Sequence, residues 1–324
     1  MENHTLIIGA GVAGLAAARF VSDCGRTVML LDKGCGVGGR LATRRDGDRK
    51  APRARWDHGA QFATFRSQDL IDRLHIWEAY QALVPWYAGA HRMISAEGMN
   101  ALAKALAKGL DVKTGQKVLR LAQTETGWRA QTESGESFEA KHLICTLPAP
   151  QLLELLEASD LKFPGMEDLR TIQYHRTLTL LAELDGPSDI PAPGCLEPTS
   201  GILRTVIDQK QKGISSAHTL IAHATSPFSL EWYDRDRNAA ASVMRAALAE
   251  RIHAKIISTQ IHGWKFAEPS QRCPLPCLNL APGLWAAGDG FMAGDDDAPP
   301  ALPPRVESAI LSGLAAAKRS IQDA

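Results

Sequence analysis

The sequence lacks an excess of charge of either sign and lacks any long uncharged apolar run. Its 324 residues include 36 basic and 36 acidic side chains, so the formal net charge is zero. Bulk electrostatic attraction to nucleic acid or to an anionic membrane is therefore not expected. No uncharged apolar segment approaches the roughly 20 residues that a membrane helix needs. We expect neither nucleic acid nor a membrane as a partner.

The N-terminal region lacks the features of a secretory signal. The chain passes from a short polar start into Leu6-Ile7-Ile8 without a basic region or a small-residue cleavage site. Cytoplasmic localisation is the expectation. Cysteine is also scarce: there are six, and the only close pair is Cys273 and Cys277. Zinc sites allow that spacing, but no second pair accompanies it, so we expect free thiols and no metal.

The start of the chain has the order of a βαβ unit. A short apolar run over 5–8 predicts a buried strand, the alanine-rich run over 15–21 a helix, and residues 27–31 a second strand. The loop between the first strand and the helix, residues 9–14, fits the pattern G-x-G-x-x-G. This context predicts a dinucleotide site.

Each glycine of the loop has a distinct expected role. Gly9 permits the tight turn, Gly11 lets the backbone approach a pyrophosphate, and Gly14 lets helix and strand pack closely. Val12 and Ala13 begin the helix, whose free N–H groups favour phosphate. The loop alone does not separate NAD from FAD.

Asp32 ends the second predicted strand, 18 residues after Gly14. A carboxylate at this place accepts both hydroxyls of a ribose and repels a 2′-phosphate. NADP is therefore disfavoured at this site.

A second glycine cluster, residues 34–40, begins two residues beyond Asp32. NAD dehydrogenases need no such cluster. The run D-K-G-x-G-x-G-G-R-L over residues 32–41 resembles the flavin-containing amine oxidase superfamily. The resemblance implies FAD, with the second loop near the pyrophosphate and Arg40 as a guanidinium clamp. The implied contacts of this loop are Lys33, Gly39, Arg40 and Leu41.

The resemblance extends to both ends of the cofactor. Val118 matches the position whose backbone meets adenine, and Gly288-Asp289 matches a C-terminal motif near the ribityl chain or phosphate. A last helix starting near Arg305-Val306 would point its N-terminus at the N1/C2 carbonyl edge of the flavin, where a helix dipole stabilises negative charge.

Within that superfamily the chain resembles the renalase-like proteins over nearly its whole length. The run Asp57-His58-Gly59-Ala60-Gln61-Phe62 resembles their D-x-G-A-Q-Y/F stretch beside the flavin, which places Gly59, Ala60 and Gln61 at FAD. Further matching segments are 147–151, 223–226, 262–267 and 305–309. The resemblance implies non-covalent FAD and oxidation of off-pathway dihydronicotinamide isomers to NAD(P)⁺. O₂ would reoxidise the flavin and give hydrogen peroxide.

The expected fold is α/β, in two parts. A Rossmann-type FAD-binding domain with a parallel sheet and a β-meander would comprise residues 1–65, 95–150 and 275–324. An α+β substrate domain with a mainly antiparallel sheet would comprise 66–94 and 151–274. The charged stretch 44–57 is expected to be an exposed loop.

Two features depart from the family pattern. The segment Gly290 to Pro304 is longer than usual, and Ser308 replaces a usual glycine. Both lie near the expected position of the flavin, so substrate access could differ.

Hydride transfer from a dihydropyridine to flavin N5 needs a stacked donor and little acid–base help. Gln61, Phe62, His223 and Trp264 are candidates for a flat substrate pocket, and no general base is assigned. For His223 a satisfied core position remains open, and for Trp264 core packing does too.

Two other functions stay open. A flavin amine oxidase acting on a small amine commonly has an aromatic cage, whereas this chain has only four tyrosines, and Gly290-Phe291 follows Asp289. The protein could also bind FAD without turnover. Substrate and O₂ are the expected partners, and the sequence does not fix the oligomeric state.

Overall fold

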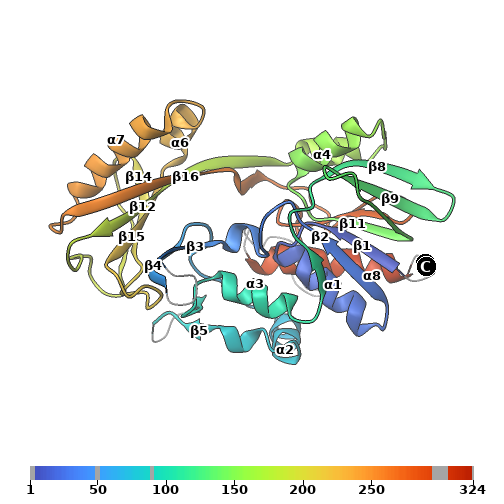
Figure 1. The fold of residues 1–324 in the computed structure, drawn as a ribbon, viewed down its shortest axis with the longest axis horizontal. Coiled ribbons are helices and arrows are strands. Elements are labelled where there is room, and N and C mark those ends of the chain that lie inside the picture. Colours follow the sequence, from blue (N-terminus) through green and yellow to red (C-terminus); the bar gives the residue numbers. More distant parts are fainter. Residues whose placement is uncertain (1–3, 48–51, 88–90, 294–305, 323–324) are drawn as a thin grey trace.

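The computed structural model describes residues 4–47, 52–87, 91–293 and 306–322 of the chain. Two sheets organise the molecule, one in each half (Figure 1). In the described ranges no helix has the length and apolar composition to span a bilayer.

The first sheet has six strands in the order β17-β18-β11-β1-β2-β7. Five of these strands are parallel: β1 (His4–Ile8), β2 (Thr27–Leu31), β7 (Asp111–Lys113), β11 (His142–Cys145) and β18 (Leu284–Ala286). The sixth, β17 (Leu278–Ala281), pairs antiparallel with β18 at the edge of the sheet. The central strands are apolar because helices and the meander cover both faces. The predicted Rossmann-like parallel sheet is confirmed.

Two helices from opposite ends of the chain pack together on one face of this sheet. α1 (Val12–Asp23) follows β1, and α8 (Val306–Gln322) lies against it (Figure 1). Gly313 makes the close approach possible, because a Cβ there would lie 2.1 Å from the carbonyl oxygen of Ala13.

The other elements of this half frame the sheet. α3 (Asn100–Ala107) and α2 (Gln68–Ile76) share the core of α1 and α8. The predicted meander is the antiparallel set β8 (Val118–Thr124), β9 (Gly127–Thr132) and β10 (Ser137–Ala140). Shorter elements are η1 (Gly39–Leu41), η2 (Tyr80–Ala82), β5 (Val84–Pro85), β6 (Met93–Ile94), α4 (Ala149–Ala158) and α5 (Met166–Thr171).

The second sheet is antiparallel, in the order β13-β14-β15-β12-β16. Its strands are β12 (Gln173–Leu184), β13 (Cys195–Leu196), β14 (Leu203–Asp208), β15 (Thr219–Ala224) and β16 (Ile256–Gln271). α6 (Ser226–Trp232) and α7 (Arg237–Ala249) cover one face, and the long strands β12 and β16 run towards the first sheet (Figure 1). All five strands come from 151–274, the larger segment of the proposed substrate domain.

The expectation that residues 44–57 form an exposed loop was wrong. β3 (Thr43–Gly47) and β4 (Pro52–Asp57) pair as antiparallel strands. Along β4 the side chains alternate, so Ala54 and Trp56 are buried against Leu181 and Ile221 of the second sheet. The Trp56 indole also donates to the Ala182 carbonyl at 3.0 Å. The many charged residues of this stretch obscured, in the sequence, the alternation of buried and exposed side chains.

Replacing Gly313 with alanine should destabilise the protein by about 1–3 kcal/mol, since either α8 or the start of α1 must shift. Gly186→Ala is the matched control, because a Cβ there meets no atom within 4 Å. Urea denaturation of both variants measures the difference. Equal stability of the two variants would show that the α1–α8 contact can adjust to a methyl group without loss of folding free energy.

Candidate active site

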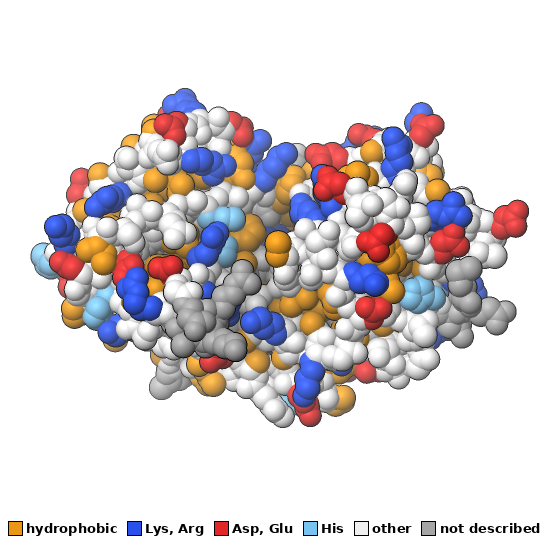
Figure 2. Space-filling view, in the orientation of Figure 1, with side chains coloured by type: hydrophobic (Ala, Val, Ile, Leu, Met, Phe, Trp, Pro, Cys, Tyr) orange, Lys and Arg blue, Asp and Glu red, His pale blue; other side chains and the backbone are white. Residues whose placement is uncertain are grey.

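One cavity of about 1040 Å³ joins the glycine loops of the first sheet to a wall formed by the second. Figure 2 shows the surface notched between the two halves of the molecule, with lysine and arginine side chains on both sides. Ligand pockets usually measure ~300–1,000 Å³, so this space is large enough for a dinucleotide together with a small substrate.

The first glycine loop lines one end of the cavity through Gly9, Gly11, Val12 and Ala13. Gly9 has φ +108°, and Gly11 caps α1 without a side chain. A Cβ on Gly11 would meet no atom within 4 Å, so the backbone at the start of α1 borders open space. The first N–H groups of a helix have no partner within the helix and suit a phosphate. Gly14 does not line the cavity; a Cβ there would lie 2.0 Å from the Gly9 carbonyl oxygen, which agrees with a packing role.

Asp32 is oriented by backbone groups at the same end. Its Oδ2 accepts from Ala10 N at 2.6 Å and its Oδ1 from Gly34 N at 2.7 Å. A carboxylate has further lone pairs, and Asp32 lines the cavity together with Lys33 and Val118. The donor set therefore fits the ribose and adenine end of FAD.

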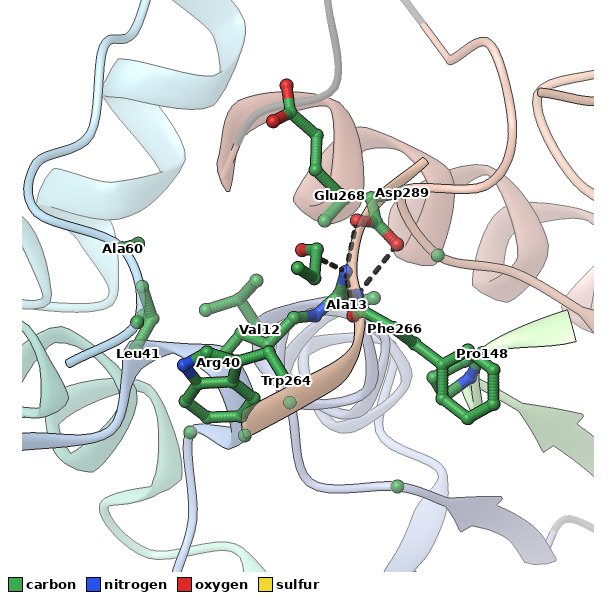
Figure 3. Close-up of a pocket in the computed structure, with 18 of the residues that line it drawn as sticks. Val12, Ala13, Arg40, Leu41, Ala60, Pro148, Trp264, Phe266, Glu268 and Asp289 are labelled. Atoms are coloured by element: carbon green, nitrogen blue, oxygen red, sulfur yellow. Dashed lines mark hydrogen bonds and ion pairs between the residues drawn. The ribbon is translucent and has the colours of Figure 1, made fainter. Parts of the chain in front are cut away.

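Arg40 and Asp289 meet in the wall of the cavity, although 249 positions separate them in sequence. Two N–H···O bonds of 2.6 and 2.7 Å join the guanidinium to the carboxylate. The guanidinium also donates to the carbonyls of Phe266 and Ala267 on β16. Figure 3 shows the two side chains facing each other, with Trp264 beside the Arg40 stem and the Glu268 carboxylate turned away.

The segment after β4 packs onto the Arg40 loop. Ala60 N donates to the Arg40 carbonyl at 2.9 Å, and a Cβ on Gly59 would lie 2.0 Å from the same oxygen. Gly39, Leu41, Gly59, Ala60 and Gly288 all line the cavity. These residues, expected at FAD, are thus brought to one surface.

Gln61 is held by a buried ion pair that the sequence did not reveal. Lys212 and Asp57 are both fully buried, with Nζ 2.7 Å from Oδ2. Lys212 Nζ also lies 3.4 Å from Gln61 Oε1, and Gln209 Nε2 lies 3.3 Å from that oxygen. Lysine can only donate, so the amide oxygen of Gln61 faces Lys212 and its amide nitrogen faces the other way.

This orientation determines the protonation of His223. Gln61 Nε2 is a donor and lies 3.2 Å from His223 Nε2, which must therefore accept. The ring hydrogen then resides on Nδ1, 3.0 Å from Thr179 Oγ1. Burial lowers the pKa of His223 to about 3, and the charges of Arg204 and Lys212 act in the same direction. His223 thus lines the cavity as a neutral ring with both nitrogens engaged.

Trp264 and Phe62 are the two aromatic candidates for the substrate pocket. Both line the cavity. The Trp264 indole donates to the His58 carbonyl at 2.8 Å, and its ring stacks on His58 with 5.4 Å between centroids. Phe62 packs against Trp86 at 5.9 Å. Trp264 therefore serves both as packing and as a cavity wall.

The start of α8 reaches the cavity through Val306 and Ala309. Arg305 and most of the long segment Gly290 to Pro304 lie outside the described residues. Ser308 is fully buried, and Glu307 Oε1 accepts from the backbone N–H groups of Arg66 and Ser67 at 2.6 and 2.8 Å. The helix terminus is thereby fixed to the segment that follows Phe62.

Three polar residues of the site were missed in the sequence: Arg92, which lines the cavity, and Lys212 and Gln209, which contact the lining residue Gln61. Each lies in a segment without a motif, and side-chain contacts with residues distant in sequence bring it to the site. Cys273 and Cys277 are buried, and the described residues form no disulfide with them.

Comparison with known families identifies two matching regions. The family described as flavin containing amine oxidoreductase matches residues 78–240, and an NAD(P)-binding Rossmann-like domain matches residues 7–75. Among curated proteins, mouse renalase is 24% identical over 320 residues, which cover 89% of this chain and 93% of renalase. An L-amino-acid oxidase of Siganus canaliculatus is 46% identical over 45 residues, only 14% of this chain and 8% of that protein.

Solved structures share the fold. An Exiguobacterium protein assigned as a protoporphyrinogen oxidase superimposes with a TM-score of 0.76 at 13% identity, over 99% of each chain. Cyclohexylamine oxidase from Brevibacterium oxydans gives 0.71 at 14% identity, over 100% of this chain and 99% of that one. The amine-oxidase-like fold is thereby established.

Arg40→Gln should weaken FAD binding about 10- to 100-fold, because charge-assisted hydrogen bonds contribute ~1.5–3 kcal/mol. Arg129→Gln is the control, since that guanidinium pairs with Glu139 on the meander, away from the cavity. Titration of apoprotein with FAD gives the dissociation constants. If both variants bind FAD like the parent protein, Arg40 serves only to hold Asp289.

Lys212→Met should destabilise the protein by about 3–5 kcal/mol, because it leaves the Asp57 charge buried without a cation. The double variant Asp57→Asn, Lys212→Met should lose less than Lys212→Met alone. Urea denaturation of both single variants and the double variant measures this coupling. Losses that simply add would mean that the pair is not an energetic unit.

Proposed function

This chain belongs to the flavin-containing amine oxidoreductase family, and on that premise we propose that it oxidises isomeric dihydronicotinamide nucleotides. It is an FAD-dependent oxidoreductase with a renalase-like sequence. In the proposed reaction the dihydronicotinamide loses a hydride, and O₂ takes up that hydride and one proton to give hydrogen peroxide and NAD(P)⁺. Bound FAD would supply the two-electron relay between them.

The proposed cofactor contacts lie in the first half of the cavity. Asp32 and Val118 would hold the adenosine end, and the N-terminus of α1 with Arg40 would hold the pyrophosphate. Asp289 and the start of α8 would adjoin the ribityl chain and the flavin. All of these contacts can be made by hydrogen bonds and ion pairs, so we propose that FAD is bound non-covalently.

The observation that carries the substrate proposal is the state of His223. Its two nitrogens are occupied by Gln61 and Thr179, and it stays neutral at ordinary pH. It therefore presents a ring surface without an available base. A dihydropyridine needs only stacking and alignment, because it transfers a hydride without prior loss of a proton.

The aromatic lining supports the same choice over a small amine. Phe62, Trp264 and Phe266 line the described part of the cavity, and no tyrosine does. A paired-tyrosine cage of the kind common in amine oxidases is thus not formed by the described lining residues.

Anaerobic mixing of the holoenzyme with 2- or 6-dihydro-NAD(P) should bleach the flavin, whereas cyclohexylamine should not. Between pH 5.5 and 8.5 the bleaching rate should change by less than about twofold, because His223, with its pKa lowered to about 3, does not titrate there. Stopped-flow absorbance measures the rate, and readmitted O₂ should yield one hydrogen peroxide per flavin turnover.

Two results would contradict this proposal. Bleaching by the amine alone, with a rate that rises with pH as the amine loses its proton, would identify an amine oxidase. Bleaching by no donor would leave a flavin-binding protein without turnover.

A further inference from the structure

Arg92 is a cation of the cavity wall that the cofactor site does not use. It directly precedes β6 and is half-buried. Its guanidinium lies 4.5 Å from the centroid of the Phe62 ring. The described residues place no carboxylate within ion-pair distance of it, whereas Arg40 pairs with Asp289 and Arg204 pairs with Glu268.

The Phe62 ring covers one side of the Arg92 guanidinium, which restricts what Arg92 can bind. An aromatic face holds the guanidinium plane and removes water from one side, while the N–H edge remains free to donate. Such an edge fits two oxygens of a phosphate or carboxylate. A cationic amine would instead be repelled, because two positive charges in a partly buried cavity interact more strongly than in water.

The position of Arg92 relates this anion site to the reacting end of the substrate. Phe62 adjoins Gln61, whose amide is fixed towards His223. Cys195 and Glu197 also line the cavity. Burial and the charge of Glu197 raise the pKa of the Cys195 thiol, whereas the charge of Arg92 lowers it. A ring lying against Gln61 and His223 would therefore have Arg92 within reach of a group attached to it.

We propose that Arg92 binds the phosphate of the nicotinamide ribonucleotide moiety, so that the enzyme selects phosphorylated dihydronicotinamides over the riboside. This inference rests on the proposed function, and it makes Arg92 a specificity-determining residue. The phosphate oxygens would accept hydrogen bonds from the guanidinium edge that faces the cavity.

The test compares three donors with the holoenzyme: the 6-dihydro isomers of nicotinamide riboside, of the mononucleotide and of the dinucleotide. Arg92→Gln should lower kcat/KM for the mononucleotide and the dinucleotide about 10- to 100-fold, mainly through KM. Turnover of the riboside should stay within about twofold. Arg92→Lys should recover part of the loss, because it keeps the charge without the fork.

A binding measurement gives a readout without turnover. The dissociation constant of oxidised nicotinamide mononucleotide, followed by the flavin absorbance change, should rise by the same factor in Arg92→Gln. Arg73→Gln is the matched control: Arg73 lies 5.5 Å from the Phe20 ring, pairs with Asp69 and is absent from the cavity lining.

Two outcomes would overturn the inference. Equal losses for riboside and mononucleotide would show that Arg92 only positions Phe62, and no loss for any donor would show that the phosphate binds elsewhere. If no dihydronicotinamide bleaches the parent flavin, the proposed function is wrong. The binding measurement then still tests whether Arg92 binds a phosphate. Mononucleotide binding that depends on Arg92 would support the phosphate site, and its absence would reject it.

Discussion

The buried ion pair between Asp57 and Lys212 connects the two halves of the site. Both charges are fully removed from water, so each is tolerable only with the other in place. Asp57 also accepts from Thr43 Oγ1 and from Met99 N, which ties β4 to β3 and to the start of α3. The loop that follows β14 is thereby fixed to the cofactor side, and Gln61 is oriented between them.

A different interaction closes the cofactor end. Arg40 and Asp289 bring together the second glycine loop and the turn after β18, and Arg40 also bonds to two β16 carbonyls. One side chain thus joins three distant segments where phosphates are expected. Close backbone contacts hold the surrounding elements in place. One of them, Gly313 against Ala13, is possible only because glycine has no side chain.

The cofactor side of the site could be predicted from the sequence because its residues lie close together along the chain. The loop 9–14, Asp32 and the run 34–40 are contiguous, and a strand followed by a glycine turn and a helix gives each a defined place. The cavity wall near His223 could not be predicted in this way. Lys212 and Arg92 belong to no motif. Residues 44–57 looked solvated because their charged side chains outnumber Ala54 and Trp56, the two buried apolar side chains of β4.

This difference bears on how substrate preference arises in such a fold. The family match indicates a flavin enzyme, and the structural similarity shows that the fold is shared with a cyclohexylamine oxidase. Substrate choice must then depend on what lines the second sheet. A neutral His223 with both nitrogens occupied gives no base for an amine. The guanidinium of Arg92, which pairs with no carboxylate of the described residues, disfavours a cation beside it. Both features favour a flat, anionic reductant, and they arise from different segments of the chain.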